Sequence, residues 1–133
     1  MPARTAALTF ALILAATLTA AATCPATNGR DDSSCDVAHP TTSTSASCAA
    51  AAHATETCAD QATGLVRAIY LTRAASEWRK AAMALGRKKS QGRYWLAHST
   101  ILDERVQDDP DAPSRLRMEA KRNEQLARAA LAR

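Results

Sequence analysis

Apolar residues recur at steps of three and four between positions 65 and 85, which places them on one face of an amphipathic helix. This face contains Leu65, Ala68, Leu71, Ala74, Ala75, Trp78, Ala81, Ala82 and Leu85. The helical signal begins near Ala49 and becomes firm from Asp60. Gly86 is expected to end the helix, and the residues GRKKSQG at this point predict a turn.

The same spacing predicts a second helix after the turn, with aromatic and apolar side chains along it. These are Tyr94, Trp95, His98, Ile101, Leu102 and Val106. Pro110 and Pro113 cannot continue a helix interior, so the second helix is expected to end before them. A third helix should follow, capped by Asp109 or Asp111. Its large apolar residues are few, which predicts loose docking.

The region before position 48 lacks this periodicity. Residues 23–47 are rich in Ser, Thr and Asp and bury too little apolar surface to offset the entropy lost on ordering, which predicts a flexible, irregular arm. No segment shows the alternation typical of a strand. We therefore predict an all-α fold, with a helical domain over residues 48–133. It should be a small disulfide-stapled helical hairpin plus a third C-terminal helix, preceded by the irregular N-terminal arm.

The first residues have the pattern of a secretory signal peptide over positions 1–22. Arg4 precedes an apolar run at 8–18, and three alanines before Thr23 offer a cleavage site. The run is shorter than the ~20 residues of a membrane-spanning helix, which disfavours a retained anchor. Acylation of Cys24 is a weaker alternative, because Thr23 is large for the residue before a lipidated cysteine. We expect a secreted or periplasmic protein with no transmembrane helix in its mature chain.

All four cysteines follow the predicted cleavage site. They are Cys24, Cys35, Cys48 and Cys58. An even number of cysteines in an oxidising compartment indicates two disulfides, for which three pairings exist. Nearest-neighbour pairing, Cys24–Cys35 with Cys48–Cys58, is favoured because short loops close most readily. Zinc is the alternative, but the spacing to His39 and His53 lacks the paired pattern of structural zinc sites. We therefore expect neither a metal nor a cofactor.

Basic and aromatic residues gather around the predicted turn between the first two helices. The candidate binding residues are Arg79, Lys80, Arg87, Lys88, Lys89, Arg93 and Tyr94; we call them the basic corner. Cations beside aromatic rings suit anionic envelope polymers or a membrane surface, and a plain solvated face is the alternative. The chain carries a net charge of +4, but no specific nucleic-acid partner is expected for an exported protein.

Tyr94 and Trp95 are adjacent in the second predicted helix. Their side chains should point about 100° apart, so they cannot share one buried face. A larger ring gains more from burial. We therefore predict that Trp95 packs toward Trp78 and Leu85 and that Tyr94 is the more exposed of the two.

Residues that can carry catalysis are present, but not in a catalytic pattern. Ser90, His98 and Ser99 are close in sequence without a nucleophile elbow or an orienting acid. Four carboxylates near the end of the second helix are expected to be solvated caps rather than a glycosidase acid pair. They are Asp103, Glu104, Asp108 and Asp109. We predict that the protein is not an enzyme.

The stretches CAAAAHATETCAD (48–60) and KKSQGRYWLA (88–97), with Tyr70 between them, resemble the LprI-like lysozyme-inhibitor family of small exported helical bacterial domains. The resemblance covers residues 48–103. The matching positions are Cys48, Cys58, Tyr70, Gln91, Trp95 and Leu96. The sequence differs from the family in one extra residue between Gln91 and Trp95 and in having HST after LA.

This resemblance implies an exported binding protein that inhibits a cell-wall hydrolase such as lysozyme. Animal lysozymes are basic, so a basic inhibitor would be repelled on approach unless acidic residues of its arm, Asp31, Asp32 and Asp36, made the contact. The competing hypothesis is a structural or surface-adsorbing protein that binds anionic envelope polymers or membrane through the basic corner.

Overall fold

The computed structural model describes residues 24, 35, 44–86 and 88–133. These residues form four α-helices, and none of them is in a strand. The helices are α1 (Ser45–Gln61), α2 (Gly64–Leu85), α3 (Ser90–Gln107) and α4 (Ser114–Leu131). The predicted all-α fold is therefore confirmed. The predicted signal peptide, at positions 1–22, lies outside the described residues.

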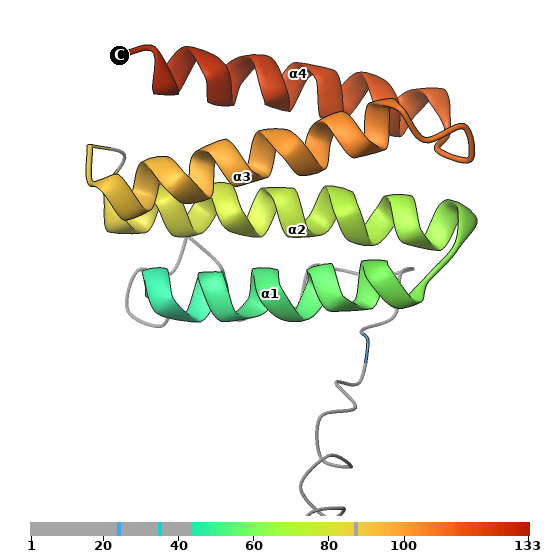
Figure 1. Cartoon of the computed structure of the whole chain (residues 1–133), viewed down its shortest axis with the longest axis horizontal. Coiled ribbons are helices and arrows are strands. Elements are labelled where there is room, and N and C mark those ends of the chain that lie inside the picture. Colours follow the sequence, from blue (N-terminus) through green and yellow to red (C-terminus); the bar gives the residue numbers. More distant parts are fainter. Residues whose placement is uncertain (1–23, 25–34, 36–43, 87) are drawn as a thin grey trace, which may run out of the picture.

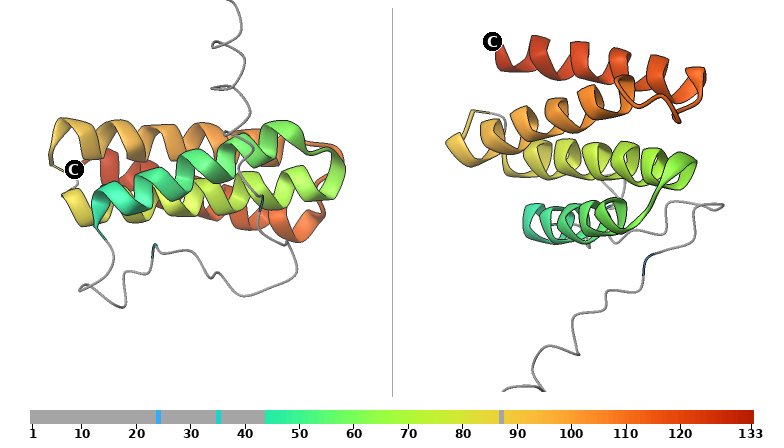
Figure 2. Two further views of the ribbon diagram at one scale, coloured as in Figure 1. Left: turned by 90° about the horizontal axis from the view of Figure 1, so that it is seen from below. Right: turned by 45° about the vertical axis from the view of Figure 1, so that its right-hand side comes forward.

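Successive helices run in opposite directions and lie beside one another in chain order (Figure 1). Short connections force this arrangement, because a helix that reverses direction within a few residues must pack on the one before it. Seen from below, α1 crosses in front of α2 and α3, whereas α4 lies behind them (Figure 2, left). Within the described part of the chain, no helix combines the length and apolarity needed to cross a membrane.

The prediction of three helices is wrong, because α1 is a separate element. It starts at Ser45, inside the predicted arm, where Thr44 forms a capping box. Thr44 Oγ1 accepts from the Ser47 amide at 3.1 Å, and Ser47 Oγ accepts from the Thr44 amide at 3.0 Å. Extended backbone at Ala62 and Thr63, followed by Gly64 at φ 61°, ends α1 and turns the chain into α2. Glycine adopts this left-handed conformation without strain.

As predicted, the core is built on the apolar face of α2. The two ends of this helix do not take part in it. Leu71 and Trp78 are buried there beside a row of alanines, whereas Leu65 is exposed and Leu85 is half-buried. The buried alanines of this helix are Ala68, Ala74, Ala75, Ala81 and Ala82. Leu102 and Val106 of α3 complete the same cluster. Small residues on α2 let both neighbouring helices approach closely.

All four cysteines are paired, but the favoured pairing is wrong. The bonds are Cys24–Cys58, with 5.6 Å between the Cα atoms, and Cys35–Cys48, with 4.7 Å. Cys48 and Cys58 both lie on α1, ten residues apart, so they are separated by about 15 Å along the helix axis. A disulfide needs Cα atoms within about 7 Å. Each end of α1 is instead tied to a cysteine that precedes it in the chain.

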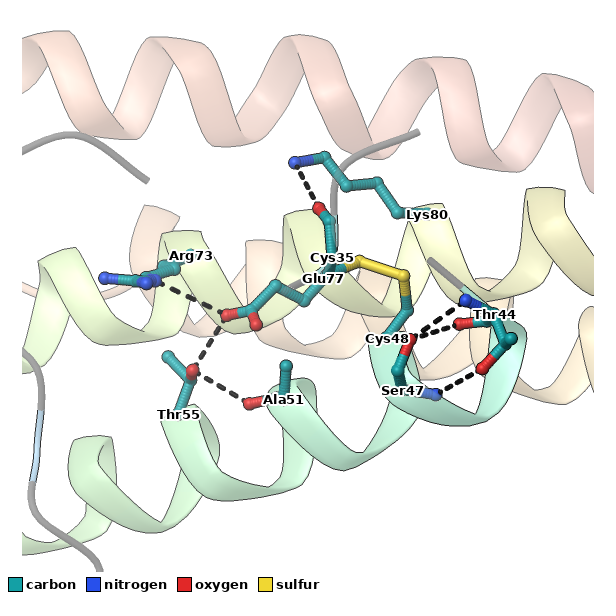
Figure 3. The surroundings of a disulfide bond; sticks show 9 residues. All are labelled: Cys35, Thr44, Ser47, Cys48, Ala51, Thr55, Arg73, Glu77 and Lys80. Carbon is teal, nitrogen blue, oxygen red and sulfur yellow. Dashed lines mark hydrogen bonds and ion pairs between the residues drawn. A yellow bond between two sulfur atoms is a disulfide. The ribbon is translucent and has the colours of Figure 1, made fainter. Parts of the chain in front are cut away.

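A buried polar network lies beside the Cys35–Cys48 bond (Figure 3). Thr55 of α1 donates its hydroxyl to Glu77 Oε1 of α2 at 2.7 Å, and Arg73 Nε lies 3.6 Å from the same oxygen. Lys80 Nζ donates to the carbonyl oxygen of Cys35 at 3.3 Å. The Thr55–Glu77 bond joins α1 to α2 directly. The Lys80 bond joins α2 to Cys35, which the disulfide ties to Cys48 of α1.

Helix α4 packs on α3 through small apolar contacts and polar bonds. Ala120 and Ala127 are its only buried residues. Arg128 pairs with Glu104 of α3, and Gln107 Nε2 of α3 donates to Glu124 Oε2 at 2.6 Å. Helix α4 has few large apolar residues, which is why loose docking was expected. Hydrogen bonds and ion pairs nevertheless also join it to α3.

Candidate functional site: a cleft between the first and third helices

The basic corner does not form a single cationic patch. Two of its members are engaged in hydrogen bonds within the fold. Arg79 Nη1 donates to Asp103 Oδ2 at 2.7 Å, and Lys80 Nζ donates to the Cys35 carbonyl oxygen. Arg93 is exposed and donates to the Leu131 carbonyl at 2.9 Å. Arg79 in particular is a structural residue, because its partner Asp103 is buried.

The remaining residues of the basic corner are Lys88 and Lys89, which are exposed at the α2–α3 turn, Tyr94, and Arg87. Arg87 lies outside the described residues. The exposed cationic surface that the structure describes at this turn is therefore limited to these two lysines, with Arg93 one turn into α3.

The candidate catalytic residues are not brought together. Ser99 is buried and donates to the Leu96 carbonyl at 2.6 Å. Ser90 is exposed at the start of α3. Among the carboxylates, Asp103 is buried against Arg79 instead of being a solvated cap, and Glu104 pairs with Arg128. Asp108 is exposed and Asp109 is half-buried next to it.

A cleft of about 390 Å³ opens where α1 faces α3 across α2. Its lining residues are His53, Glu56, Thr57, Asp60, Trp78, Gln91, Tyr94, Trp95 and His98; we call it the aromatic–acidic cleft. Positions 53, 56, 57 and 60 form an i, i+3, i+4, i+7 stripe on α1, and positions 91, 94, 95 and 98 form the same stripe on α3. Such spacing places four side chains on one helix face. The two stripes face each other above Trp78 of α2.

Glu56 is the polar centre of the cleft. Its Oε2 accepts a hydrogen bond from Trp78 Nε1 at 3.1 Å, and His98 Nε2 lies 3.0 and 3.1 Å from its two oxygens. A carboxylate can only accept, so His98 Nε2 carries the hydrogen in this contact. One carboxylate of α1 therefore joins side chains from α2 and α3, and it is held in one orientation.

The rings around Glu56 differ in their exposure. Trp78 is only 2% exposed and is met edge-on by two imidazoles, with ring centroids 4.8 Å away at His53 and 5.4 Å away at His98. Trp95 is half-buried, tilted against Trp78 at 6.0 Å. Tyr94 is 64% exposed and lies nearly parallel to His98. The prediction that Trp95 packs and Tyr94 is the more exposed is confirmed.

The lining residues have an uneven charge. Two carboxylates, Glu56 and Asp60, belong to the cleft, and no arginine or lysine is among the nine residues. Arg105 approaches from the rim, where its Nη2 lies 3.9 Å from Asp60 Oδ1. A cleft with aromatic walls and acidic groups on one side suits ligands that carry positive charge or hydrogen-bond donors.

The sequence patterns do not identify the side of the cleft that α1 forms. The sequence patterns identify Tyr94, Trp95 and His98 but not Glu56, Thr57 or Asp60. They present His53 only as a possible zinc ligand. The available signal was the spacing of polar residues in HATETCAD at i, i+3, i+4 and i+7. It becomes visible only once α1 is recognised as a helix of its own.

No group of three or more His, Cys, Asp or Glu side chains in the described residues is arranged to hold a metal ion. Comparison of the chain with protein-family models, with curated proteins and with solved structures found no match.

Proposed function

We propose that this protein is an exported helical binding protein that engages a partner through the aromatic–acidic cleft and performs no catalysis itself. The observation that carries this proposal is the cleft, in which an exposed tyrosine and two carboxylates surround a fixed indole floor. Binding sites are typically concave, largely pre-formed and lined by aromatic residues with a few placed polar groups.

The rigidity of the walls supports binding. Glu56 is held by Trp78 and His98, and its helix α1 is tied near both ends by disulfides. A site that is ordered before its partner arrives loses less conformational entropy on binding. Two disulfides also agree with an oxidising compartment, secreted or periplasmic, and with the signal-peptide pattern.

The partner that we propose is a cell-wall hydrolase such as lysozyme, which the protein would inhibit. The resemblance to lysozyme inhibitors suggests this class, and the charge of the cleft removes an objection to it. Although the chain is basic as a whole, the aromatic–acidic cleft presents Glu56 and Asp60 without a lysine or arginine among its lining residues. A basic enzyme can be met by local complementarity even when the net charges of both proteins are positive.

The second candidate function is adsorption to anionic envelope polymers or membrane through the α2–α3 turn. The observation in its favour is the exposure of Lys88 and Lys89. Against it, Arg79 and Lys80 are engaged inside the fold. Adsorption of this kind depends on long-range attraction and is lost steeply as salt screens it.

The test is inhibition of cell-wall lysis by a basic hydrolase, with binding measured by calorimetry at low and at physiological salt. We expect a saturable complex of fixed stoichiometry that persists at physiological salt and is weakened by Tyr94→Ala. Lys88→Glu/Lys89→Glu is the matched change outside the cleft and should leave inhibition intact. Unhindered lysis with no heat of binding would refute the inhibitor, and binding that disappears with salt and with the lysine reversals would support adsorption instead.

A further inference from the structure

We infer that the aromatic–acidic cleft takes the cationic end of a side chain, the guanidinium of an arginine or the ammonium of a lysine, presented by the partner protein. This inference rests on the proposed function, because it treats the cleft as the contact site for a protein. It adds the kind of group that enters the cleft and the residues that recognise it.

The two carboxylates of the cleft are placed to meet a cation from the same side. Glu56 and Asp60 are one helical turn apart on α1, so both face the same space from one wall. Glu56 has fixed oxygens on the cleft, and an ionised carboxylate offers about four acceptor positions. The side chain of Asp60 is 64% exposed, and Arg105 reaches it only at 3.9 Å. A cation in the cleft would lie between the oriented carboxylate of Glu56 and the exposed carboxylate of Asp60.

The aromatic rings of the cleft are placed to meet the same cation from the other side. A cation gains energy over the face of a tryptophan or tyrosine within about 6 Å of the ring centre. Tyr94 and Trp95 line the wall opposite the carboxylates, and Trp78 closes the floor. The same group can therefore touch an aromatic face on one side and a carboxylate on the other. Guanidinium suits such a site well, because it is planar, stacks on rings and donates to carboxylates in pairs.

A neutral glycan is the competing occupant, since sugars also bind between aromatic rings and carboxylates. The structure favours the cation because of the charge of the α1 wall. The charge of Glu56 and Asp60 is not balanced by any arginine or lysine that lines the cleft. A volume of about 390 Å³ is near the lower end for ligand sites, in keeping with one side chain.

The experiment is a titration of the oxidised protein with capped amino acids. The probes are N-acetyl-arginine methylamide and N-acetyl-lysine methylamide, with N-acetyl-citrulline methylamide as the neutral isostere of arginine and a chitooligosaccharide as the glycan. The chain has two tryptophans, Trp78 and Trp95, and both line the cleft, so intrinsic fluorescence reports on its occupancy. Amide chemical shifts of α1 and α3 measure the same titration independently.

We expect the arginine probe to bind at least about tenfold more tightly than citrulline, the size expected for one charge-assisted hydrogen bond. Glu56→Gln and Asp60→Asn should each weaken binding of the charged probes, and both together should abolish it. Asp111→Asn removes an exposed carboxylate at the α3–α4 turn, outside the cleft, and should leave binding unchanged. If Glu56→Gln lowers helicity, the exposed Asp60→Asn still decides the question.

Equal affinity for arginine and citrulline, tighter binding of the glycan, or no response to any probe would overturn the inference. The result is separable from that of the proposed function. Cation binding without any effect on a cell-wall hydrolase would leave the inference standing and remove the hydrolase as partner. Inhibition that is insensitive to Glu56→Gln and Asp60→Asn would keep the hydrolase as partner and overturn the inference that a cation enters the cleft.

Discussion

His98 of α3 contacts Glu56 of α1 across the width of α2, with Nε2 3.0 Å from Oε2. The two residues belong to helices that are not consecutive, and Trp78 of the intervening helix donates to the same oxygen. The aromatic–acidic cleft is therefore organised around one carboxylate of α1 that contacts side chains from α2 and α3. This arrangement makes Glu56 important for the stability of the domain, and the proposed function gives it a role in recognition as well.

Removal of this carboxylate should destabilise the domain measurably. Glu56→Ala leaves the buried Trp78 Nε1 without its acceptor, for which we expect a loss of about 1–3 kcal/mol in the free energy of unfolding. Glu56→Gln keeps an acceptor oxygen and should cost less. Asp60→Ala, on the same helix but exposed, should stay within about 0.5 kcal/mol. Urea denaturation followed by circular dichroism measures all three, and equal losses for the two alanine variants would contradict the role given to Glu56.

The two neighbouring aromatic residues of α3 should respond differently to truncation. Trp95 is half-buried and packs against buried residues of the core, so Trp95→Ala should cost about 2–4 kcal/mol, slightly below the range for fully buried tryptophans. Tyr94 is 64% exposed, and Tyr94→Ala should cost about 1 kcal/mol or less while weakening partner binding. Thermal melts together with the hydrolase assay separate the two effects. A stable Trp95→Ala protein that no longer binds would assign Trp95 to recognition.

The disulfide pairing can be read directly by peptide mapping. Proteolysis of the oxidised protein without reductant should release peptides that join Cys24 to Cys58 and Cys35 to Cys48. Loss of one bond through the pair of changes Cys35→Ser/Cys48→Ser should lower the free energy of unfolding by about 2–5 kcal/mol. A peptide containing Cys48 linked to Cys58 would be incompatible with a continuous α1 between them.

Features encoded in local periodicity could be predicted from the sequence. The apolar stripe around Leu71 and Trp78 and the prolines at 110 and 113 located three of the four helices. The 100° step between adjacent helical residues showed that Tyr94 and Trp95 cannot share one buried face. The greater burial of Trp95 followed from its larger ring and its expected packing on Trp78. The helix positions themselves are consequences of periodicity and need no contact distant in the sequence.

Features that depend on distant contacts could not be predicted in this way. The break at Ala62–Thr63 carries no proline, so α1 and α2 merge in the periodic signal, and the helix that keeps Cys48 from Cys58 stays hidden. Arg79 resembles a surface cation until its buried partner Asp103, 24 positions later, is placed beside it. The Glu56–His98 contact spans 42 positions, and neither residue has a local pattern that points to the other.

The α2–α3 turn provides a test of the adsorption hypothesis. Lys88→Glu/Lys89→Glu should reduce binding to anionic vesicles several-fold at low salt and leave helicity unchanged, because both side chains are exposed at a turn. Arg79→Ala should instead destabilise the fold, because it leaves Asp103 buried without its ion-pair partner. Vesicle cosedimentation and circular dichroism measure the two properties. Vesicle binding that is unaffected by the lysine reversals would leave the turn as an ordinary solvated surface.

Asp103 should make stability depend on pH in the neutral range. Burial raises the pKa of Asp103 from 3.8 to about 7, against the opposing effect of Arg79, while Glu119 and Glu124 of α4 act in the same direction as burial. A raised pKa means that the folded state favours the protonated acid. The stabilising contribution is therefore fully present below about pH 4 and is lost as the pH rises through 7.

The magnitude follows from the size of that shift. The free energy of unfolding should fall by up to about 4 kcal/mol between pH 4 and pH 8 on account of this residue, at about 1.4 kcal/mol for each pKa unit. Asp103→Asn preserves the shape and an acceptor for Arg79 but cannot titrate, so the difference between its pH profile and that of the unmodified protein isolates the contribution of Asp103. Asp111→Asn, an exposed carboxylate, should reproduce the profile of the unmodified protein. Parallel profiles for Asp103→Asn and the unmodified protein would mean that Arg79 keeps Asp103 ionised throughout this range, and that the two form a permanent ion pair joining α2 to α3.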